Sequence, residues 1–188
     1  IKNSKNRLSY CGILLLATVF FNACKSNDEA IFKPVSSAES GISFQNNILK
    51  KENFNILYYL YYYNGGGVAT GDINNDGLQD IYFTANNKAA NKLYLNKGNM
   101  KFEDITDKAG VKGSADWCSG VTMADVNSDG FLDIYVSSVS GRYGLKGHNE
   151  LYINNKNNSF TESSEKYGLN TSCATTQSAF FDYDRDCD

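Results

Sequence analysis

Histidine is nearly missing from this sequence, and its scarcity argues against several kinds of catalytic site. The chain of 188 residues contains one histidine, His148. With no second histidine, the sequence offers nothing on which to build a histidine-based zinc site or a nucleophilic triad. We expect His148 to be a loop residue of the glycine-rich insertion 139–148 rather than a catalytic base.

A basic stripe is also missing, although the sequence has 18 lysines and arginines. The formal net charge is −3, so nothing favours direct binding to a nucleic-acid backbone. Ten of the 21 acidic residues lie in three short loops. These ten residues are Asp72, Asp76, Asp80, Asp125, Asp129, Asp133, Asp182, Asp184, Asp186 and Asp188.

Apolar runs long enough to span a membrane are missing too. The apolar stretch Ile13–Phe21 is shorter than the roughly 20 residues of a membrane-spanning helix. Positive residues at 2, 5 and 7 precede it and Asn22-Ala23 follows it, which is the order of a secretory signal. We therefore predict a signal peptide over residues 1–23 and an exported protein.

Cys24, directly after Ala23, makes this segment resemble a bacterial lipoprotein lipobox, with Phe21 where leucine is usual. The resemblance implies a lipid anchor on Cys24, with the two or more acyl chains that stable anchoring needs. Residues 24–30 would form a polar tether. Their acidic character resembles the signal that sends some Gram-negative lipoproteins to the cell surface, although a solvated linker explains it equally well. We expect an outer-membrane or cell-surface location, with a plain secreted protein as the alternative.

An acidic segment of nine residues is the most informative feature that is present. Asp72–Asp80 returns almost unchanged as Asp125–Asp133 and begins a third time at Asp182. Oxygen side chains at positions 1, 3, 5 and 9 converge only if the backbone curls tightly, and the glycine at position 6 supplies the positive φ. Hard oxygen ligands in this arrangement favour Ca²⁺.

Two other interpretations of the loop were weighed. An EF-hand needs a glutamate at position 12, which Phe83 and Val136 occupy here, so an EF-hand is rejected. A polar Asx turn between strands remains the alternative. Two full copies on a fixed repeat make it less favoured than calcium binding.

The repeat extends beyond the loops and predicts the fold. The first residues of successive acidic loops are 125 − 72 = 53 and 182 − 125 = 57 residues apart. Each unit holds four short runs rich in β-branched and aromatic residues, typical of a four-stranded propeller blade. Helical spacing is absent apart from a short turn around 106–109. We predict an all-β fold, a β-propeller of four-stranded antiparallel blades, with about three blades in residues 31–188.

Several motifs in a fixed order resemble a known family. They are the two loops, the run Gly65–Asp72, Lys101–Thr106 with the following Ala109–Val111, and Ala179–Asp182. Together they resemble the FG-GAP/VCBS-type repeat proteins, and more narrowly the ASPIC/UnbV (cartilage acidic protein-like) group. The resemblance implies a seven-bladed propeller with Ca²⁺ in the loop between the first two strands of a blade.

The resemblance also implies a ligand set. In the third loop Cys187 stands where glycine belongs, and the sequence reaches Asp188 before a ninth position. The implied ligands are Asp72, Asn74, Asp76, Leu78 (carbonyl) and Asp80 in the first loop, Asp125, Asn127, Asp129, Phe131 (carbonyl) and Asp133 in the second, and Asp182, Asp184 and Asp186 in the third.

The cysteines do not indicate a disulfide framework. Of the five, Cys11 and Cys24 fall in the signal and the anchor. Cys118, Cys173 and Cys187 remain, which is an odd number. One Cys118–Cys173 bridge stays open, because both residues precede an acidic loop by similar distances.

The aromatic residues are expected to serve packing more than binding. Tyr58–Tyr63 reads as a strand buried on both faces, and the glycines of 65–67 as positions of close strand packing. Trp117 and Tyr143 are better candidates for exposed contacts.

Two classes of function follow. The first is a non-catalytic, calcium-binding propeller on an envelope lipoprotein, which presents a surface to a protein or glycan. The alternative is a propeller module of a carbohydrate- or polymer-degrading enzyme. The first is favoured because acid–base chemistry needs a positioned pair of groups outside the metal loops, and the sequence shows no clustered carboxylates there. We also expect a piece of a longer propeller, with Phe32–Val35 as an outer strand of a further blade.

Overall fold

The computed structural model describes residues 31–48 and 53–184. The predicted signal peptide, the tether, Cys24, Asp186 and Cys187 lie outside the described residues. The chain divides into two compact units, Ile1–Pro34 and Val35–Asp188, and all the sheets lie in the second. No helix among the described residues is long and apolar enough to cross a membrane.

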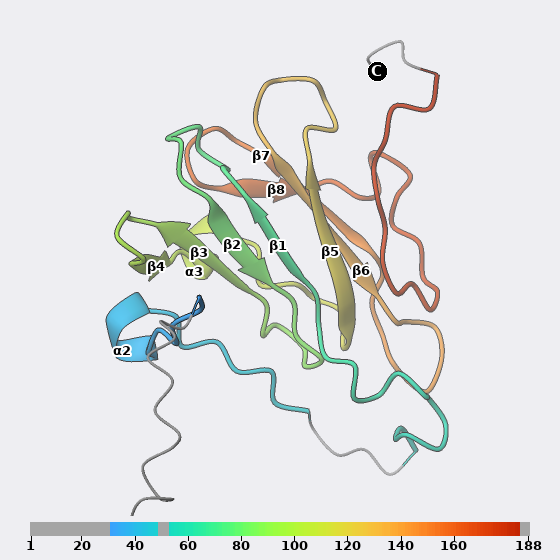
Figure 1. The fold of residues 1–188 in the computed structure, drawn as a ribbon. Helices are drawn as coiled ribbons and strands as arrows, with labels where there is room; N and C mark the ends of the chain where they lie inside the picture. Colours follow the sequence, from blue (N-terminus) through green and yellow to red (C-terminus); the bar gives the residue numbers. More distant parts are fainter. Residues whose placement is uncertain (1–30, 49–52, 185–188) are drawn as a thin grey trace, which may run out of the picture. The chain divides into compact units, whose positions relative to one another are not determined.

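The second unit contains two four-stranded antiparallel sheets, so the predicted all-β class is confirmed (Figure 1). In each sheet the strands lie in chain order and neighbours are joined as hairpins. The first sheet consists of β1 (Val68–Gly71), β2 (Asp80–Phe83), β3 (Lys92–Asn96) and β4 (Phe102–Asp104), and the second of β5 (Cys118–Ala124), β6 (Asp133–Ser138), β7 (Glu150–Asn154) and β8 (Phe160–Glu162).

The two sheets have the same register at equivalent positions. Tyr94 on β3 pairs with Asp104 on β4, and Tyr152 on β7 pairs with Glu162 on β8. Each sheet is therefore one copy of the repeat. Side chains on the inner face alternate with outward ones along each strand, so equivalent residues of the two copies face equivalent surroundings.

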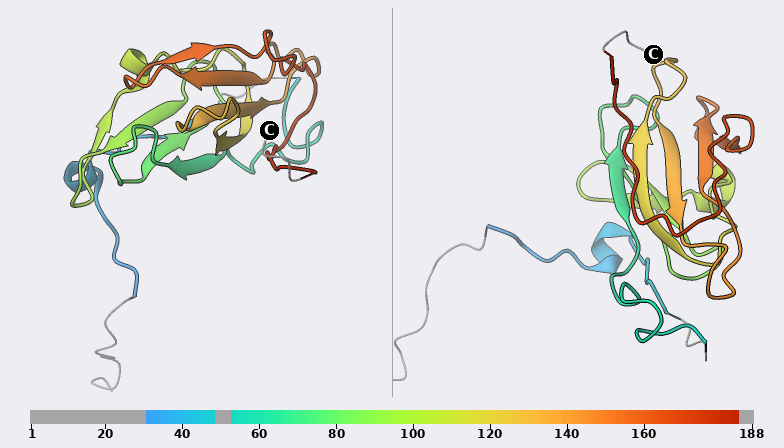
Figure 2. Two further views of the ribbon diagram at one scale, coloured as in Figure 1. Left: turned by 90° about the horizontal axis from the view of Figure 1, so that it is seen from above. Right: turned by 90° about the vertical axis from the view of Figure 1, so that its right-hand side faces the viewer.

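The sheets meet along β1 and β5, which are neighbours in Figures 1 and 2. The core between them contains Tyr82, Leu93, Ile134 and Val136, all almost fully buried. A Cβ on Gly67 would lie 2.8 Å from the Gly120 Cα, closer than real Cβ atoms approach. The prediction of close strand packing at residues 65–67 is thus confirmed for Gly66 and Gly67, whereas a Cβ on Gly65 would meet no atom closer than 3.9 Å.

Two short helices complete the unit. The helix α2 (Ser37–Ser40) begins at Ser36, whose side chain accepts a hydrogen bond from the Glu39 N–H, a common N-cap arrangement. The helix α3 (Thr106–Ala109) follows β4 and confirms the helical turn predicted there. Residues 32–35, predicted as an outer strand, are exposed and form no strand. Because the predicted strand belongs to a further blade that the described residues do not contain, it stays a prediction.

The third repeat forms no sheet within the described residues. After β8 the only regular pairing up to residue 184 is an isolated bridge between Val139 and Ala174. The segment also contacts the second sheet through a backbone hydrogen bond from the Thr175 N–H to the Ser138 carbonyl and through side chains. Gln177 donates to the Val121 carbonyl, and Ser119 donates to the Thr175 carbonyl. The described residues therefore contain two sheets rather than about three blades.

The tyrosine run is a series of turns and not the predicted strand. Tyr59 and Tyr62 are buried while Tyr58, Tyr61 and Tyr63 are exposed. The two buried rings pack on Trp117, which is 2% exposed. Trp117 is therefore a packing residue, contrary to expectation, because the turns fold back over its ring.

Tyr143 is 37% exposed, although its ring also contacts Phe54. Cys118 is buried and Cys173 exposed, and both are free thiols. The Cys118–Cys173 bridge that the sequence left open is therefore absent from this structure.

Candidate functional site

The two complete acidic loops connect the first two strands of each sheet and share one backbone conformation. Gly77 and Gly130, at position 6, both have a φ of 86°, as the sequence predicts for the tight curl. Asn75 and Ser128, at position 4, also have positive φ values, 59° and 56°. Both loops thus take the same turn although they differ at positions 2, 4, 7 and 8, which indicates that the residues they share determine it.

Side-chain oxygens organise each loop through backbone hydrogen bonds. Asp72 Oδ2 accepts from the Gly77 N–H at 2.7 Å, and Asp72 Oδ1 and Asn74 Oδ1 both accept from the Asp76 N–H, at 3.1 and 3.2 Å. In the second loop Asp125 and Asn127 repeat all three bonds. Positions 1 and 3 are therefore gathered around one amide.

The position-9 carboxylates have a different role, because they are buried. Asp80 is fully buried, and its two oxygens accept from the Ile73 N–H at 3.0 Å and the Asn96 N–H at 2.7 Å. Asp133 repeats this arrangement with the second sheet, at 3.0 and 2.7 Å. Each of these carboxylates ties the start of its loop to the third strand of its blade.

The remaining predicted ligands are more open. Asp76 is exposed and Asp129 is partly exposed. Their Oδ1 atoms accept from the N–H groups of Leu78 and Phe131 at position 7. Asp182 and Asp184 of the third loop are exposed, and Asp186 lies outside the described residues.

The charges of the loops are unevenly stabilised. Burial raises the pKa of Asp80, two backbone N–H groups oppose this, and the nearby Asp76 and Asp72 carboxylates raise it further. The same causes raise the pKa of Asp133. For Asp125 the small effect of burial is outweighed by backbone N–H groups, the Gly130 N–H foremost, and its pKa is lowered.

The types of oxygen ligand in the loops suit a hard cation, but the positions of their side chains do not yet form a binding site. Carboxylate, amide and carbonyl oxygens are the ligands that Ca²⁺ takes. Within the described ranges, however, no three acidic, histidine or cysteine side chains converge closely enough to hold a metal ion. Asp72 and Asp80 instead direct their oxygens at backbone N–H groups, so ion binding would require small rotations of these side chains.

The two loops contact each other and differ in one charge. Asn75 Nδ2 donates to the Gly130 carbonyl at 2.9 Å, which joins the loops across the sheet boundary. Lys156 Nζ lies 3.4 Å from Asp129 Oδ2 and 5.2 Å from the Phe131 ring centroid. The equivalent position beside the first loop is Gly98. An ammonium group therefore accompanies the second loop only.

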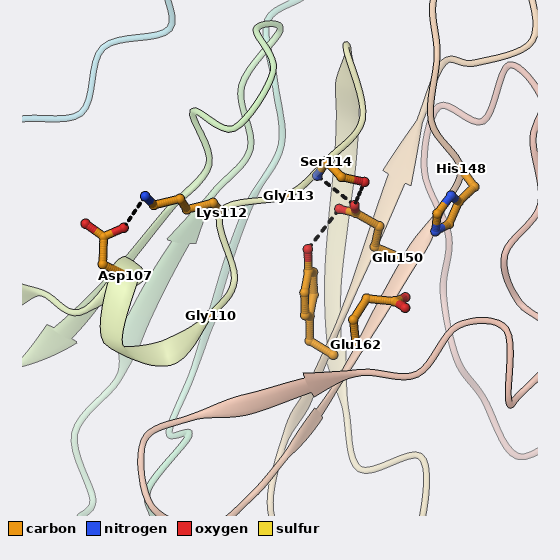
Figure 3. Close-up of a pocket in the computed structure, with 9 residues that line it drawn as sticks. Asp107, Gly110, Lys112, Gly113, Ser114, His148, Glu150 and Glu162 are labelled. Carbon is orange, nitrogen blue, oxygen red and sulfur yellow. Dashed lines mark hydrogen bonds and ion pairs between the residues drawn. The ribbon is translucent and has the colours of Figure 1, made fainter.

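A cavity away from the loops was missed by sequence reasoning. It has a volume of about 470 Å³ and lies beside α3, β7 and β8. Glu150 and Glu162 both line it (Figure 3), so two carboxylates outside the loops do lie together. The signal that could have found them is a difference between the repeats, because Lys92 and Asp104 stand at the equivalent positions of the first copy.

Comparison with known families and proteins agrees with the predicted resemblance. Residues 72–136 match the FG-GAP-like repeat family, and this stretch contains both complete loops. Cartilage acidic protein 1 from Xenopus tropicalis is 32% identical over 125 residues, which are 66% of this chain and 19% of that protein. The human protein of the same name is 30% identical over 125 residues, 66% of this chain and 18% of that protein.

The mouse protein of that name is 37% identical over 81 residues, 43% of this chain and 12% of that protein. The chain thus spans less than a fifth of the length of these curated relatives. The similarity concerns the repeat and does not by itself transfer the activity of a whole protein.

Proposed function

Because this chain carries an FG-GAP-like repeat and is homologous to cartilage acidic protein 1, we propose that it is a calcium-binding, non-catalytic propeller module. The observation that carries the proposal is the pair of acidic loops with the same backbone turn and the same hydrogen bonds. A polar Asx turn alone would not require an acidic side chain at positions 1, 5 and 9 of both copies.

In this proposal each loop supplies oxygens from positions 1, 3, 5, 7 and 9. Positions 1 and 3 already lie around one amide. Position 5, exposed in the first loop and partly exposed in the second, would exchange its present hydrogen bonds for an ion. Bound Ca²⁺ would offset the mutual repulsion of three carboxylates per loop. Because the loops contact each other through Asn75 and Gly130, we infer that ion binding also strengthens the boundary between the sheets.

Export and membrane anchoring belong to the proposal on the strength of the sequence alone. Cys24 would carry the lipid, and the repeats would face the envelope or the cell surface. The wild-type protein is then expected to partition into detergent and membranes, while Cys24→Ala does not. Equal partitioning of both forms would contradict the anchor and leave the calcium proposal intact.

A protein or glycan ligand is proposed as the partner, in preference to a substrate. The enzyme alternative needs a positioned acid–base pair. Glu150 is the obvious candidate, but its oxygens already accept hydrogen bonds from Ser114 and Tyr152. A carboxylate committed in this way is poorly placed to exchange a proton with a substrate, so we favour binding over catalysis.

Thermal unfolding tests the calcium proposal. An ion that binds only the folded state at a hundredfold excess over its Kd adds about 2.7 kcal/mol per site. The melting temperature should rise with Ca²⁺ and fall with chelator, and Asp76→Ala should lose part of the rise. Glu165 is an exposed acid outside the loops, so Glu165→Ala is the matched control. It should keep the full rise in melting temperature with Ca²⁺. A melting temperature unaffected by millimolar Ca²⁺ would refute the proposal.

A further inference from the structure

The cavity beside α3 has an unequal distribution of charge. Figure 3 shows Asp107 and Lys112 at one side, and Glu150, Glu162 and His148 at the other. Lys112 and Asp107 form an ion pair with each other, so their charges offset. Two glutamates remain, and the lining carries a formal charge of −2 with the histidine neutral. The cavity therefore favours a cationic ligand.

Glu150 is buried and held in place by hydrogen bonds to both of its carboxylate oxygens. It is 1% exposed, and Oε1 accepts from both the N–H and the hydroxyl of Ser114, at 2.7 and 2.5 Å. The Tyr152 hydroxyl donates to Oε2 at 3.0 Å. Three donors thus fix the orientation of this carboxyl group. Among the described residues neither Glu150 nor Glu162 takes part in an ion pair.

The first sheet has an ammonium group at the place where the second sheet has the cavity. Lys92 is equivalent to Glu150, and Asp104 to Glu162, by the shared register of the two sheets. Lys92 Nζ lies 2.8 Å from Asp104 Oδ2. The first copy of the repeat thus holds an ammonium group on this carboxylate. The second copy has replaced the lysine by a second acid and has a cavity at the same place.

Asp104 and the equivalent Glu162 each accept one further hydrogen bond, and this bond is the same in both copies. Asp104 Oδ1 accepts from the Thr106 N–H at 3.0 Å, and Glu162 Oε1 from the Ser164 N–H at 3.0 Å. The other oxygen of Glu162 has no protein partner among the described residues, whereas that of Asp104 binds lysine. Glu162 therefore presents to the cavity the acceptor that an ammonium group occupies in the sister sheet.

A buried hydroxyl gives an independent sign that the second network is incomplete. The Thr106 hydroxyl donates to Asp104 and accepts from the Leu93 N–H at 2.9 Å. Its equivalent, Ser164, is fully buried, yet its hydroxyl has no hydrogen-bond partner in the part of the chain that the structure describes. Buried polar atoms without partners are rare in folded proteins. Ser164 is not among the residues that line the cavity, so its hydroxyl marks a difference between the two networks and is not itself a contact to a ligand.

We propose that this cavity binds a ligand through a protonated primary amine, with the ammonium group on Glu162 and in the field of the buried Glu150 carboxylate. The volume of about 470 Å³ lies within the range of about 300–1,000 Å³ typical of small-molecule pockets. Gly110 and Gly113 leave one wall without side chains. A Cβ on Gly113 would lie 2.5 Å from Asn91 Nδ2 and 3.3 Å from Glu150 Oε2, so that wall approaches the carboxylate closely.

Two sources share this ligand chemistry, the side chain of lysine and an amino sugar. Isothermal titration calorimetry of the full chain in saturating Ca²⁺ separates them. One arm uses Nα-acetyl-lysine methylamide with Nα-acetyl-norleucine methylamide as its uncharged match. The other uses glucosamine with N-acetylglucosamine. We expect one of the two amines to bind saturably and its uncharged match to bind at least tenfold more weakly, because hydrogen bonds to charged groups are the strong ones.

Glu162→Gln keeps the size of the side chain and removes its charge, and should weaken amine binding about tenfold or more. Glu165→Gln, three residues away on an exposed turn, is the control and should bind as wild type. Equal melting temperatures of both variants establish that folding is unaffected. Saturable binding by neither amine, or wild-type binding by Glu162→Gln, overturns the proposal. Asp76→Ala should bind the amine normally, because this site is independent of the calcium loops.

Discussion

Asp80 and Asp76 belong to the same loop, but the structure predicts opposite consequences for their removal. Asp80 is buried and accepts two backbone N–H groups, whereas Asp76 is exposed. Substitution of Asp80 by alanine leaves the N–H groups of Ile73 and Asn96 without acceptors. Asp80 should therefore stabilise the fold without any ion, and Asp76 should contribute mainly when an ion is bound.

The magnitude follows from the two lost bonds. A hydrogen bond to a charged group contributes about 1.5–3 kcal/mol, so two give about 3–6 kcal/mol. The raised pKa of Asp80 lowers this figure. A carboxyl group whose pKa is higher when folded loses stabilisation as the pH rises through that pKa. At neutral pH we expect the lower end, about 3 kcal/mol, out of a total of about 5–15 kcal/mol for a typical domain.

Urea unfolding in excess chelator measures this difference, with the midpoint and slope of each variant compared with wild type. Asp80→Ala should lose about 3 kcal/mol, and Asp80→Asn, which keeps one acceptor oxygen, about half of that. Asp76→Ala should lose less than about 1 kcal/mol in chelator, as is usual for an exposed site, but should respond less to added Ca²⁺. Equal losses for Asp80→Ala and Asp76→Ala in chelator would refute the reasoning.

Three further predictions concern single side chains. Lys156→Met should tighten Ca²⁺ binding at the second loop, measured by calorimetry, because it removes the ammonium group that faces that loop; unchanged affinity would contradict this. Burial raises the pKa of Cys118 to about 12, so at pH 8 iodoacetamide should label the exposed Cys173 and leave Cys118 unmodified until the protein unfolds, as mass spectrometry can show. Burial opposes the lowered pKa of Asp104, but the hydrogen bond from Lys92 and others outweigh it. The advantage of wild type over Lys92→Met in urea unfolding, at most about 1 kcal/mol, should therefore fade as the pH drops below about 3.9.

The comparison of the two copies explains why parts of the site escaped sequence reasoning. Positions 1 to 9 of the loops are close in sequence, so their residue types and spacing predicted the turn and the positive φ of Gly77 and Gly130 correctly. Glu150 and Glu162 lie on different strands, and only the pairing of β7 with β8 brings them to one cavity. The unusual charge of this pair is recognised only by comparison with the first sheet. Lys92 and Glu150 become equivalent positions when the strands of the two copies are superposed.

The tyrosine run shows the converse case, in which a local pattern was misleading. The composition of an aromatic run favours a strand. Other backbone conformations can bury some of the same rings, however, so composition does not decide between them. Contact with Trp117 and Phe54 decided instead for turns that bury Tyr59 and Tyr62. Tertiary packing of large rings outweighed the local preference for a strand, since intrinsic strand preferences span only about 1 kcal/mol.

By itself the sequence determined the repeat, its all-β class, the two loops and their glycines, because these features depend on residues near one another in the chain. Only the tertiary structure decided that Asp80 and Asp133 are buried supports of the fold, that Trp117 is a core residue, and that two carboxylates of the second sheet line one cavity. The physical reason is that burial and charge are set by neighbours brought from other strands. Aspartates of one loop, such as Asp76 and Asp80, therefore acquire different roles according to what packs against them.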